Sequence, residues 1–378
     1  MKTYLFPGQG SQHIGMGENL FDAFPDITAV TDRILGYSIK ELCLQDPSQQ
    51  LGRTQYTQPA LYVVNALAYR QQLKDTGEQP DFVAGHSLGE YNALESAGVI
   101  SFEDGLKLVK KRGELMSTAP KGAMAAVIGL SADKISGILA ENGLTAIDIA
   151  NYNSHTQTII SGLEADIQNA QIYFEQEQAM FIPLNVSGAF HSRYMQPIQD
   201  EFSRFLDSFT FAAPKIPVIA NIHAQPYQAD QIARNLADQL THSVRWLDSM
   251  HFLLQQGDMA FLELGPGDVL SKLIRSIKSQ FKPNAAAPSR APEPVISQAI
   301  KQATDQVDRE QAVKTPQQKV NDWNRLYPVG TQVSAKGYDE ILTTKTQAVI
   351  LFGHRAAVYM QGYNGYFALD EVEPASPA

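Results

Sequence analysis

The stretch at residues 81–90, Asp-Phe-Val-Ala-Gly-His-Ser-Leu-Gly-Glu, restricts the possible folds more than any other part of the chain. Its apolar residues 82–84 are typical of a short buried strand, and the residues that follow the stretch are typical of a helix. Ser87 therefore lies on a tight strand-to-helix turn, with Gly85 and Gly89 where side chains would collide. Such a turn lifts a serine hydroxyl clear of a sheet and directs the first helical N–H groups toward it. The alternative is a glycine-rich connection in an α/β domain, because short motifs also occur by chance.

The composition allows a folded protein with a substantial core. The chain has 378 residues, enough for one large or about two to three ordinary domains, and 44% of them are hydrophobic. A formal net charge of −10 argues against a nucleic-acid partner, because phosphate contacts need a basic face. The single cysteine, Cys43, excludes an internal disulfide and a cysteine-based zinc cluster, and a buried thiol is its simplest interpretation. We expect no metal site.

The sequence shows neither a targeting segment nor a membrane span. It begins with a strand-like run at residues 3–6, without the basic region and long apolar stretch of a signal peptide. No apolar run approaches the length that a bilayer-spanning helix needs. We therefore expect a cytoplasmic protein with no membrane partner, and we expect a monomer.

Residues 1–122 and 187–280 are predicted to form one large, hydrolase-like α/β domain with a parallel sheet and helices. Helical periodicity at residues 15–75 breaks near Pro47 and Pro59. Strands are expected at residues 3–6, 82–84, 217–221 and 260–264, with helices at 59–73, 101–117, 194–207, 232–239 and 244–254.

Two segments of this domain place polar side chains near Ser87. The loop at residues 6–12 is rich in glycine and leaves Gln9 near the end of the first strand, although it is also consistent with a plain turn. Ser101, followed three residues later by Asp104, is typical of a helix N-terminus. Arg112 lies on an apolar face of that helix, which is unusual for a solvated arginine.

Residues 123–186 show a different pattern. Strands are expected at residues 124–128, 145–150, 156–161 and 180–184, and helices at 131–141 and 163–176. This β-α-β-β-α-β order is the ferredoxin-like arrangement. We interpret the segment as a small ferredoxin-like subdomain inserted into the larger domain.

Beyond residue 280 the sequence pattern changes twice, first to that of a linker and then to that of short strands. Residues 281–320 are predicted to be a linker, rich in proline and alanine at 282–294 and then polar and helical in pattern. Residues 321–374 are predicted to form a small SH3-like β-barrel of short strands at 331–336, 341–352, 355–360 and 366–372. Its core is expected to come from tyrosines, namely Tyr327, Tyr338, Tyr359, Tyr363 and Tyr366.

A serine hydroxyl at neutral pH needs a base to become a nucleophile. His191 is the best candidate, because it lies at the re-entry into the large domain between a strand end and a helix start; the alternative is an ordinary loop histidine. His86 is adjacent to Ser87 in sequence and so is badly placed to reach back to it. No Asp or Glu stands out as a third member, so the group that orients the histidine is expected to be a carbonyl.

Six motifs together carry a family resemblance. They are FPGQGSQ at residues 6–12, GHSLGE at 85–90, RGELM at 112–116, NYNS at 151–154, GAFHS at 188–192 and ELGPG at 263–267. In this order they closely resemble the malonyl-CoA:acyl-carrier-protein transacylases, and most of all the freestanding acyltransferases that act in trans for modular polyketide synthases. The resemblance covers residues 1–280, and the family also has the inserted ferredoxin-like subdomain.

The resemblance implies a role for each matching residue. Ser87 matches the acylated nucleophile and His191 the general base and acid. Gln9 and the backbone N–H of Leu88 match the oxyanion hole, and Gln239 resembles the residue whose main-chain carbonyl holds the histidine.

The resemblance also implies a preference for malonyl. Arg112 matches the arginine that pairs with the malonyl carboxylate, and a guanidinium can make two parallel hydrogen bonds to such a group. Phe190, next to His191, would crowd a methyl branch between the two carbonyls. Two features depart from the family: His155 stands where proline is usual, and the tail from about residue 320 is absent from the ordinary fatty-acid enzymes.

The leading hypothesis is therefore transfer of malonyl from malonyl-CoA, through Ser87, to the phosphopantetheine thiol of an acyl carrier protein. No cofactor is expected, since malonyl-CoA is a substrate and phosphopantetheine belongs to the partner. The alternatives are a proofreading acyl hydrolase on the same fold, which would gain nothing from Arg112, and an interaction module that docks on a synthase. A lipase-like hydrolase is disfavoured, because no His-Gly-Gly-Gly motif and no triad acid occur.

Overall fold

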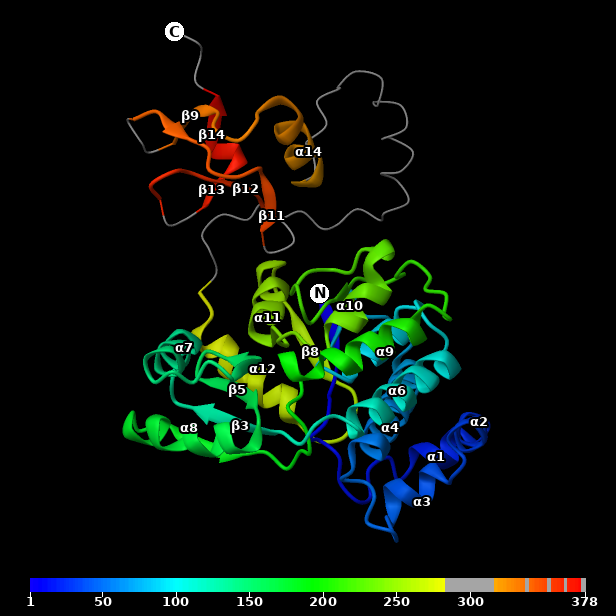
Figure 1. The fold of residues 1–378 in the computed structure, drawn as a ribbon. Helices are drawn as coiled ribbons and strands as arrows, with labels where there is room; N and C mark the ends of the chain where they lie inside the picture. The colour runs from blue at the N-terminus through cyan, green and yellow to red at the C-terminus, as the bar shows by residue number, and fades with distance from the viewer. Residues whose placement is uncertain (283–315, 337–339, 352–354, 364–365, 375–378) are drawn as a thin grey trace, which may run out of the picture. The chain divides into compact units, whose positions relative to one another are not determined.

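The structure, a computed structural model, describes residues 1–282, 316–336, 340–351, 355–363 and 366–374 (Figure 1). Contacts within the chain divide it into two compact units, Met1–Ser289 and Arg290–Ala378. Among the described helices, none combines the length and apolar character that a bilayer crossing requires.

A four-stranded parallel sheet organises the first unit. Its strand order is β7–β2–β1–β8, with bounds Val218–Ile219, Phe82–Gly85, Lys2–Phe6 and Ala260–Glu263. Every neighbouring pair runs parallel. Side chains alternate along β1, so that Tyr4 and Phe6 join one core and Leu5 joins another. The predicted α/β fold with a parallel sheet is confirmed.

Helices cover both faces of this sheet (Figure 1). The face of Tyr4 and Phe6 packs against α4 (Thr54–Thr76), α5 (Gly89–Ser96), α6 (Phe102–Ser117), α9 (Gln196–Leu206) and α10 (Ile232–Asp238). The face of Leu5 packs against α11 (Trp246–Gln255) and α12 (Val269–Gln280). The remaining elements are α1 (Leu20–Ala23), α2 (Pro25–Leu35), α3 (Ile39–Leu44), η1 (Arg193–Met195) and η2 (Ala229–Gln231).

Two helix starts test the sequence patterns. Helix α4 begins at Thr54 and continues through Pro59, so the predicted break at this proline is wrong. Pro59 is the sixth residue of α4 and removes one helical hydrogen bond, but the buried side chains on both sides of it hold the helix in place. Helix α6 starts where predicted, with Ser101 Oγ accepting the Asp104 N–H at 3.0 Å.

The inserted segment follows the predicted element order. It consists of β3 (Ala123–Ile128), α7 (Ala132–Glu141), β4 (Asp148–Ser154), β5 (Gln157–Gly162), α8 (Glu164–Gln176) and β6 (Met180–Pro183). The strands form an antiparallel sheet in the order β4–β5–β3–β6. The predicted strand at residues 145–150 starts too early, because the chain turns between Leu144 and Ile147 before β4 begins.

The inserted sheet has two different faces. Ala125 and Val127 of β3 pack against α7 and α8, whereas Met124 and Ala126 face the core of the large domain. Strand β4 also contacts the segment before α11, where the Tyr152 N–H donates to the Val244 carbonyl at 2.9 Å. The insertion is therefore anchored beside the carboxyl end of the parallel sheet.

The described residues of the second unit form helix α14, the short helix η3 and two small antiparallel sheets. Helix α14 (Pro316–Leu326) begins inside the range predicted as linker, whose residues 283–315 lie outside the described chain. One sheet contains β10 (Leu342–Thr343), β9 (Gln332–Ala335) and β14 (Val372–Pro374); the other contains β11 (Val349–Leu351), β12 (Arg355–Tyr359) and β13 (Tyr366–Ala368). A short helix, η3 (Leu369–Glu371), joins β13 to β14, so the predicted strands at 341–352 and 366–372 are each divided.

Among the described side chains of this unit, no tyrosine belongs to the buried core that the sequence predicted. It is built from aliphatic residues of the strands together with Val320 and Trp323 of α14. Tyr327 and Tyr363 only pack against its margin, and Tyr338 lies outside the described residues. The prediction left out Trp323, whose buried ring lies 4.8 Å from that of Tyr327.

Candidate active site

Ser87 occupies the turn between β2 and α5 in a left-handed conformation, with φ of +50°. A Cβ on Gly85 would lie 1.9 Å from the Gly89 carbonyl carbon, and one on Gly89 would lie 2.0 Å from the Phe6 oxygen. The positive φ of Ser87 is costly for a residue with a side chain. Asn221 holds the turn by accepting the Ser87 N–H at 2.7 Å and donating to the Gly85 carbonyl at 2.7 Å.

Ser87 and His191 form a hydrogen-bonded pair. Ser87 Oγ lies 2.8 Å from His191 Nε2, and His191 Nδ1 lies 2.8 Å from the Gln239 carbonyl oxygen. A carbonyl oxygen only accepts, so Nδ1 carries the hydrogen and Nε2 is free to accept a proton from Ser87. A backbone carbonyl thus stands where other serine enzymes place a carboxylate.

Burial keeps His191 neutral. Burial, together with the positive charge of Arg112, lowers the pKa of His191 to about 3. Since a general base must be deprotonated, this environment keeps the imidazole in the form that can receive a proton.

Arg112 lies beside Ser87 and is 1% exposed. Its Nη1 donates to Gln58 Oε1 at 2.7 Å, and its Nη2 donates to Gln239 Oε1 at 2.9 Å and to Ser87 Oγ at 3.2 Å. These acceptors are neutral oxygens, and burial lowers the pKa of the guanidinium. A buried cation with neutral partners next to a nucleophile suits an anionic group on the substrate.

One cavity of 460 Å³ brings the nucleophile, the base and the arginine together. Ser87, Arg112 and His191 line it, and so do Gln9, Leu88 and Phe190. Gln9 contacts Thr54, whose hydroxyl donates a hydrogen bond to Gln9 Oε1 at 3.0 Å. Phe190 is buried beside the histidine. The cavity also includes Asn151 and Asn153 of the inserted sheet, so both parts of the first unit build it.

The sequence patterns did not single out three polar residues that contact the site. Asn221 supports the turn of Ser87, Gln58 binds Arg112, and Glu90 is buried behind the site with hydrogen bonds to Asn221 and Gln239. Glu90 lies inside the GHSLGE motif, which was the available signal for it, whereas Gln58 ends the polar run TQYTQ at residues 54–58 and carried no such signal.

The two other histidines considered in the sequence make no hydrogen bond to Ser87, although His86 lines the same cavity. His86 Nε2 lies 2.8 Å from Asn153 Oδ1, and the ring packs 5.4 Å from that of Trp246. His155 follows β4, with its ring 5.0 Å from that of His251.

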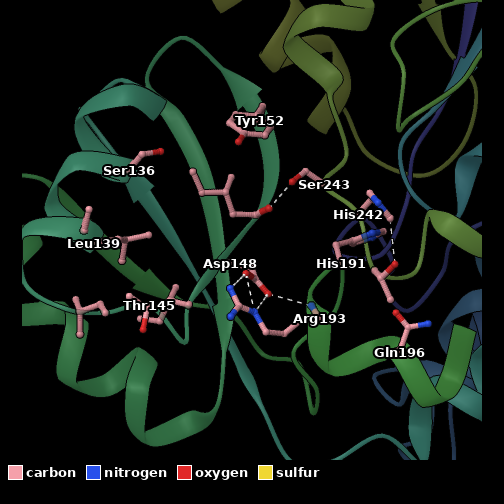
Figure 2. Close-up of a pocket in the computed structure, with 15 residues that line it drawn as sticks. Ser136, Leu139, Thr145, Asp148, Tyr152, His191, Arg193, Gln196, His242 and Ser243 are labelled. Atoms are coloured by element: carbon pink, nitrogen blue, oxygen red, sulfur yellow. Dashed lines mark hydrogen bonds and ion pairs between the residues drawn. The ribbon is translucent and has the colours of Figure 1, made fainter. Parts of the chain in front are cut away.

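A second cavity, of 760 Å³, reaches His191 from the side of the inserted sheet (Figure 2). Asp148 of β4 accepts the Arg193 N–H at 2.9 Å and forms an ion pair with the Arg193 side chain. His242 and Ser243 line the facing wall, where Ser243 Oγ donates to the Ile149 carbonyl. Through these contacts the insertion binds Arg193, which follows His191 in sequence, and Ser243, which follows Gln239.

The fold and this pair of residues define a serine acyltransferase. The family of acyl transferase domains matches residues 3–319 of the chain. Because the match covers most of the sequence, the chain belongs to this family.

Several relatives are similar over about three quarters of the chain. The polyketide biosynthesis malonyl CoA-acyl carrier protein transacylase BaeC of Bacillus velezensis is 57% identical over 288 residues, which cover 76% of this chain and 100% of the relative. Its counterpart PksC of Bacillus subtilis is 54% identical over 280 residues, or 74% of this chain and 97% of the relative.

A solved malonyl CoA-acyl carrier protein transacylase from Burkholderia pseudomallei is 50% identical, with a TM-score of 0.73 over 75% of this chain and 99% of that one. A malonyl-transacylase solved with its type II polyketide synthase acyl-carrier protein is 36% identical, with a TM-score of 0.70 over 74% of this chain and 93% of that one.

Proposed function

We propose that this acyltransferase moves malonyl from malonyl-CoA to the phosphopantetheine thiol of an acyl carrier protein, in trans, for a polyketide synthase. The single observation that carries the proposal is the buried Arg112 guanidinium beside the Ser87–His191 pair. The names of the similar proteins agree with this reaction.

Acylation begins when Ser87 Oγ attacks the thioester carbonyl carbon and its proton passes to His191 Nε2. The tetrahedral intermediate collapses, the carbon–sulfur bond breaks, and the CoA sulfur takes the proton from His191. In the second half, the carrier's thiol gives a proton to His191 and attacks the acyl-serine, and the released Ser87 oxygen takes that proton back. The 2.8 Å contact between the two residues suits both proton transfers.

Gln9 and the Leu88 N–H are the proposed oxyanion donors. Both residues line the cavity with Ser87, and Leu88 stands directly before α5. Each such donor is typically worth about 2.7–4 kcal/mol of the barrier.

Arg112 and Phe190 are proposed to select the acyl group. The guanidinium pairs with the malonyl carboxylate, whereas a neutral acyl group would leave the buried charge unpaired. The Phe190 ring lines the same cavity beside His191 and leaves little room for a methyl branch. A proofreading hydrolase for neutral acyl groups is therefore disfavoured.

The reaction needs no cofactor in this proposal, because the nucleophile, the base and the oxyanion donors all belong to the protein. The partner is the carrier protein, whose phosphopantetheine enters as the second substrate. We expect the enzyme to act as a monomer.

We also propose a fold for the inserted segment and for the second unit. The β-α-β-β-α-β order and the antiparallel order β4–β5–β3–β6 support a ferredoxin-like subdomain at residues 123–186. Two three-stranded sheets, with η3 before the last strand, support an SH3-like barrel at residues 321–374.

The test is mass spectrometry of the protein after brief incubation with malonyl-CoA, acetyl-CoA or methylmalonyl-CoA. We expect a malonyl adduct that Ser87→Ala abolishes and that a phosphopantetheinylated carrier protein removes faster than water does. Arg112→Ala should slow malonyl acylation about 10- to 100-fold, as the loss of a charged hydrogen-bonding group predicts, and reduce the preference over acetyl. An adduct that is indifferent to Arg112 and simply hydrolyses would favour the hydrolase.

A further inference from the structure

We propose that Glu90 is a positioning residue that aligns both His191 and Arg112 through one shared side chain, that of Gln239. The inference rests on the proposed function, because it assigns a role within the acylation step. It concerns a group that touches neither the substrate nor Ser87 Oγ.

Glu90 is fully surrounded by hydrogen-bond donors. Its carboxylate is buried, with the residue 1% exposed, at the start of α5. Oε1 accepts the Asn221 N–H at 2.8 Å and the Tyr227 hydroxyl at 2.8 Å, and Oε2 accepts Gln239 Nε2. A carboxylate is acceptor-only, so these donors match its ionised form.

The orientation of the Gln239 amide follows from its neighbours. Arg112 Nη2 can only donate, so the amide oxygen faces the guanidinium at 2.9 Å. The Ser87 carbonyl can only accept, so Nε2 faces it at 2.9 Å. The remaining hydrogen of Nε2 points to Glu90. Every polar atom of this amide therefore has a partner, and Glu90 supplies the only charged acceptor among them.

The same residue holds the histidine through its backbone. The Gln239 carbonyl accepts from His191 Nδ1, so any shift of Gln239 moves the acceptor that orients the imidazole. Glu90 also binds the backbone N–H of Asn221, whose side chain supports the strained turn at Ser87. One carboxylate thus fixes the nucleophile, the base and the arginine, which come from segments far apart in sequence.

Electrostatics agree with this geometry. Burial raises the pKa of Glu90 to about 7, against the opposing effect of its hydrogen bonds and of Arg112. At pH 8 the carboxylate is therefore mostly ionised and acts as a counter-charge one side chain removed from the guanidinium.

The experiment measures the rate constant of Ser87 acylation by malonyl-CoA at pH 8, in the full chain, by rapid-quench mass spectrometry. The variants are Glu90→Gln, Gln239→Ala and the double variant. The matched control is Glu95→Gln, because Glu95 is a buried carboxylate on the same helix that pairs instead with Arg70 at 2.6 Å.

We expect Glu90→Gln to slow acylation about 10- to 100-fold, as losing a hydrogen bond to a charged group implies, with Glu95→Gln close to the wild-type rate. A glutamine at position 90 keeps an amide oxygen for the Asn221 N–H and the Tyr227 hydroxyl and loses the acceptor for Gln239 Nε2. The double variant should therefore be no slower than Gln239→Ala alone. Wild-type rates for Glu90→Gln, or effects that multiply in the double variant, would overturn the proposal.

Tyr227→Phe is a milder second variant if Glu90→Gln does not fold. It removes one donor from Glu90 and leaves Gln239 intact. A loss of about two- to tenfold that disappears in the Gln239→Ala background supports the role, and an unchanged rate contradicts it.

A small activated ester, p-nitrophenyl acetate, separates this inference from the proposed function. The ester reports on the Ser87–His191 pair without any malonyl group. If malonyl-CoA fails to acylate the wild type but the ester succeeds, the proposed substrate is wrong, and the ester rates of the same variants still decide the role of Glu90.

Discussion

At the scale of single residues, two buried groups of the site have pKa values displaced in opposite directions. Burial lowers the pKa of His191 to about 3, so this base stays neutral throughout the physiological range. Burial raises the pKa of Glu90 to about 7, so this carboxylate takes up a proton as the pH falls through neutrality. The other ionisable groups coupled to Glu90 are Arg112, Tyr91 and Tyr227, and burial keeps both tyrosines neutral by raising their pKa.

This difference predicts the pH dependence of acylation. As the pH is lowered from 8 to 5, the wild-type kcat/KM should decrease, with an inflection near pH 7. The reason is that protonated Glu90 has one acceptor fewer for the groups that donate hydrogen bonds to it. Glu90→Gln should be slower but flat over the same range, since His191 does not titrate there. The measurement is the pH–rate profile of both proteins, and an inflection near 6.5 that survives in the variant would mean that His191 titrates normally.

At the scale of elements, the strand-to-helix turn depends on the absence of side chains at Gly85 and Gly89. The Phe6 carbonyl of β1 approaches Gly89 so closely that any Cβ must push the strand away. Since the loop with Gln9 follows β1 directly, displacement of the strand reaches the proposed oxyanion donors as well. Close packing of the β1 backbone against the backbone of the turn therefore sets the position of the Ser87 hydroxyl.

Gly89→Ala should destabilise the protein by about 1–3 kcal/mol or more and abolish most acylation of Ser87. The control is Gly137→Ala in α7, where a Cβ meets no described atom within 4 Å and a helical alanine should add about 0.5–1 kcal/mol of stability. Thermal unfolding and acyl-adduct mass spectrometry of both variants provide the measurement. Equal behaviour of the two would show that the close approach at Gly89 is not needed.

At the scale of the whole molecule, the two units have separate hydrophobic cores. The described core residues of the second unit all lie between Val320 and Val372, whereas every proposed catalytic group lies in the first. The similar transacylases of Bacillus velezensis and Bacillus subtilis are covered almost completely by a match of 288 or 280 residues, which is about three quarters of this chain.

A chain that ends at residue 282 should therefore fold and form the malonyl adduct at a rate within about twofold of the full chain, because the first unit has its own core and contains every proposed catalytic group. Cooperative thermal unfolding and the same adduct measurement test this expectation. A truncated chain that folds but cannot be acylated would assign the second unit a part in catalysis.

The sequence by itself determined the elements and their order. The α/β core, the glycine-bounded turn and the helix of Arg112 each follow from local patterns, because periodicity and steric demand act within a few residues. Ser87, His191, Arg112, Gln9, Leu88, Phe190 and Gln239 were all chosen in the sequence, and the structure gathers them around one site. Local patterns failed where a neighbour in space decided the outcome, as at Pro59 and in the tyrosines of the second unit.

Only the tertiary structure decided how the polar network closes. Glu90 meets Asn221 and Gln239 across 131 and 149 residues of sequence, and no periodicity marks such a contact. A buried polar group must find its partners wherever the fold brings them, so its partners are a property of the packed molecule. The nucleophile could therefore be read from the sequence, whereas the residues that hold it in place emerged only from the fold.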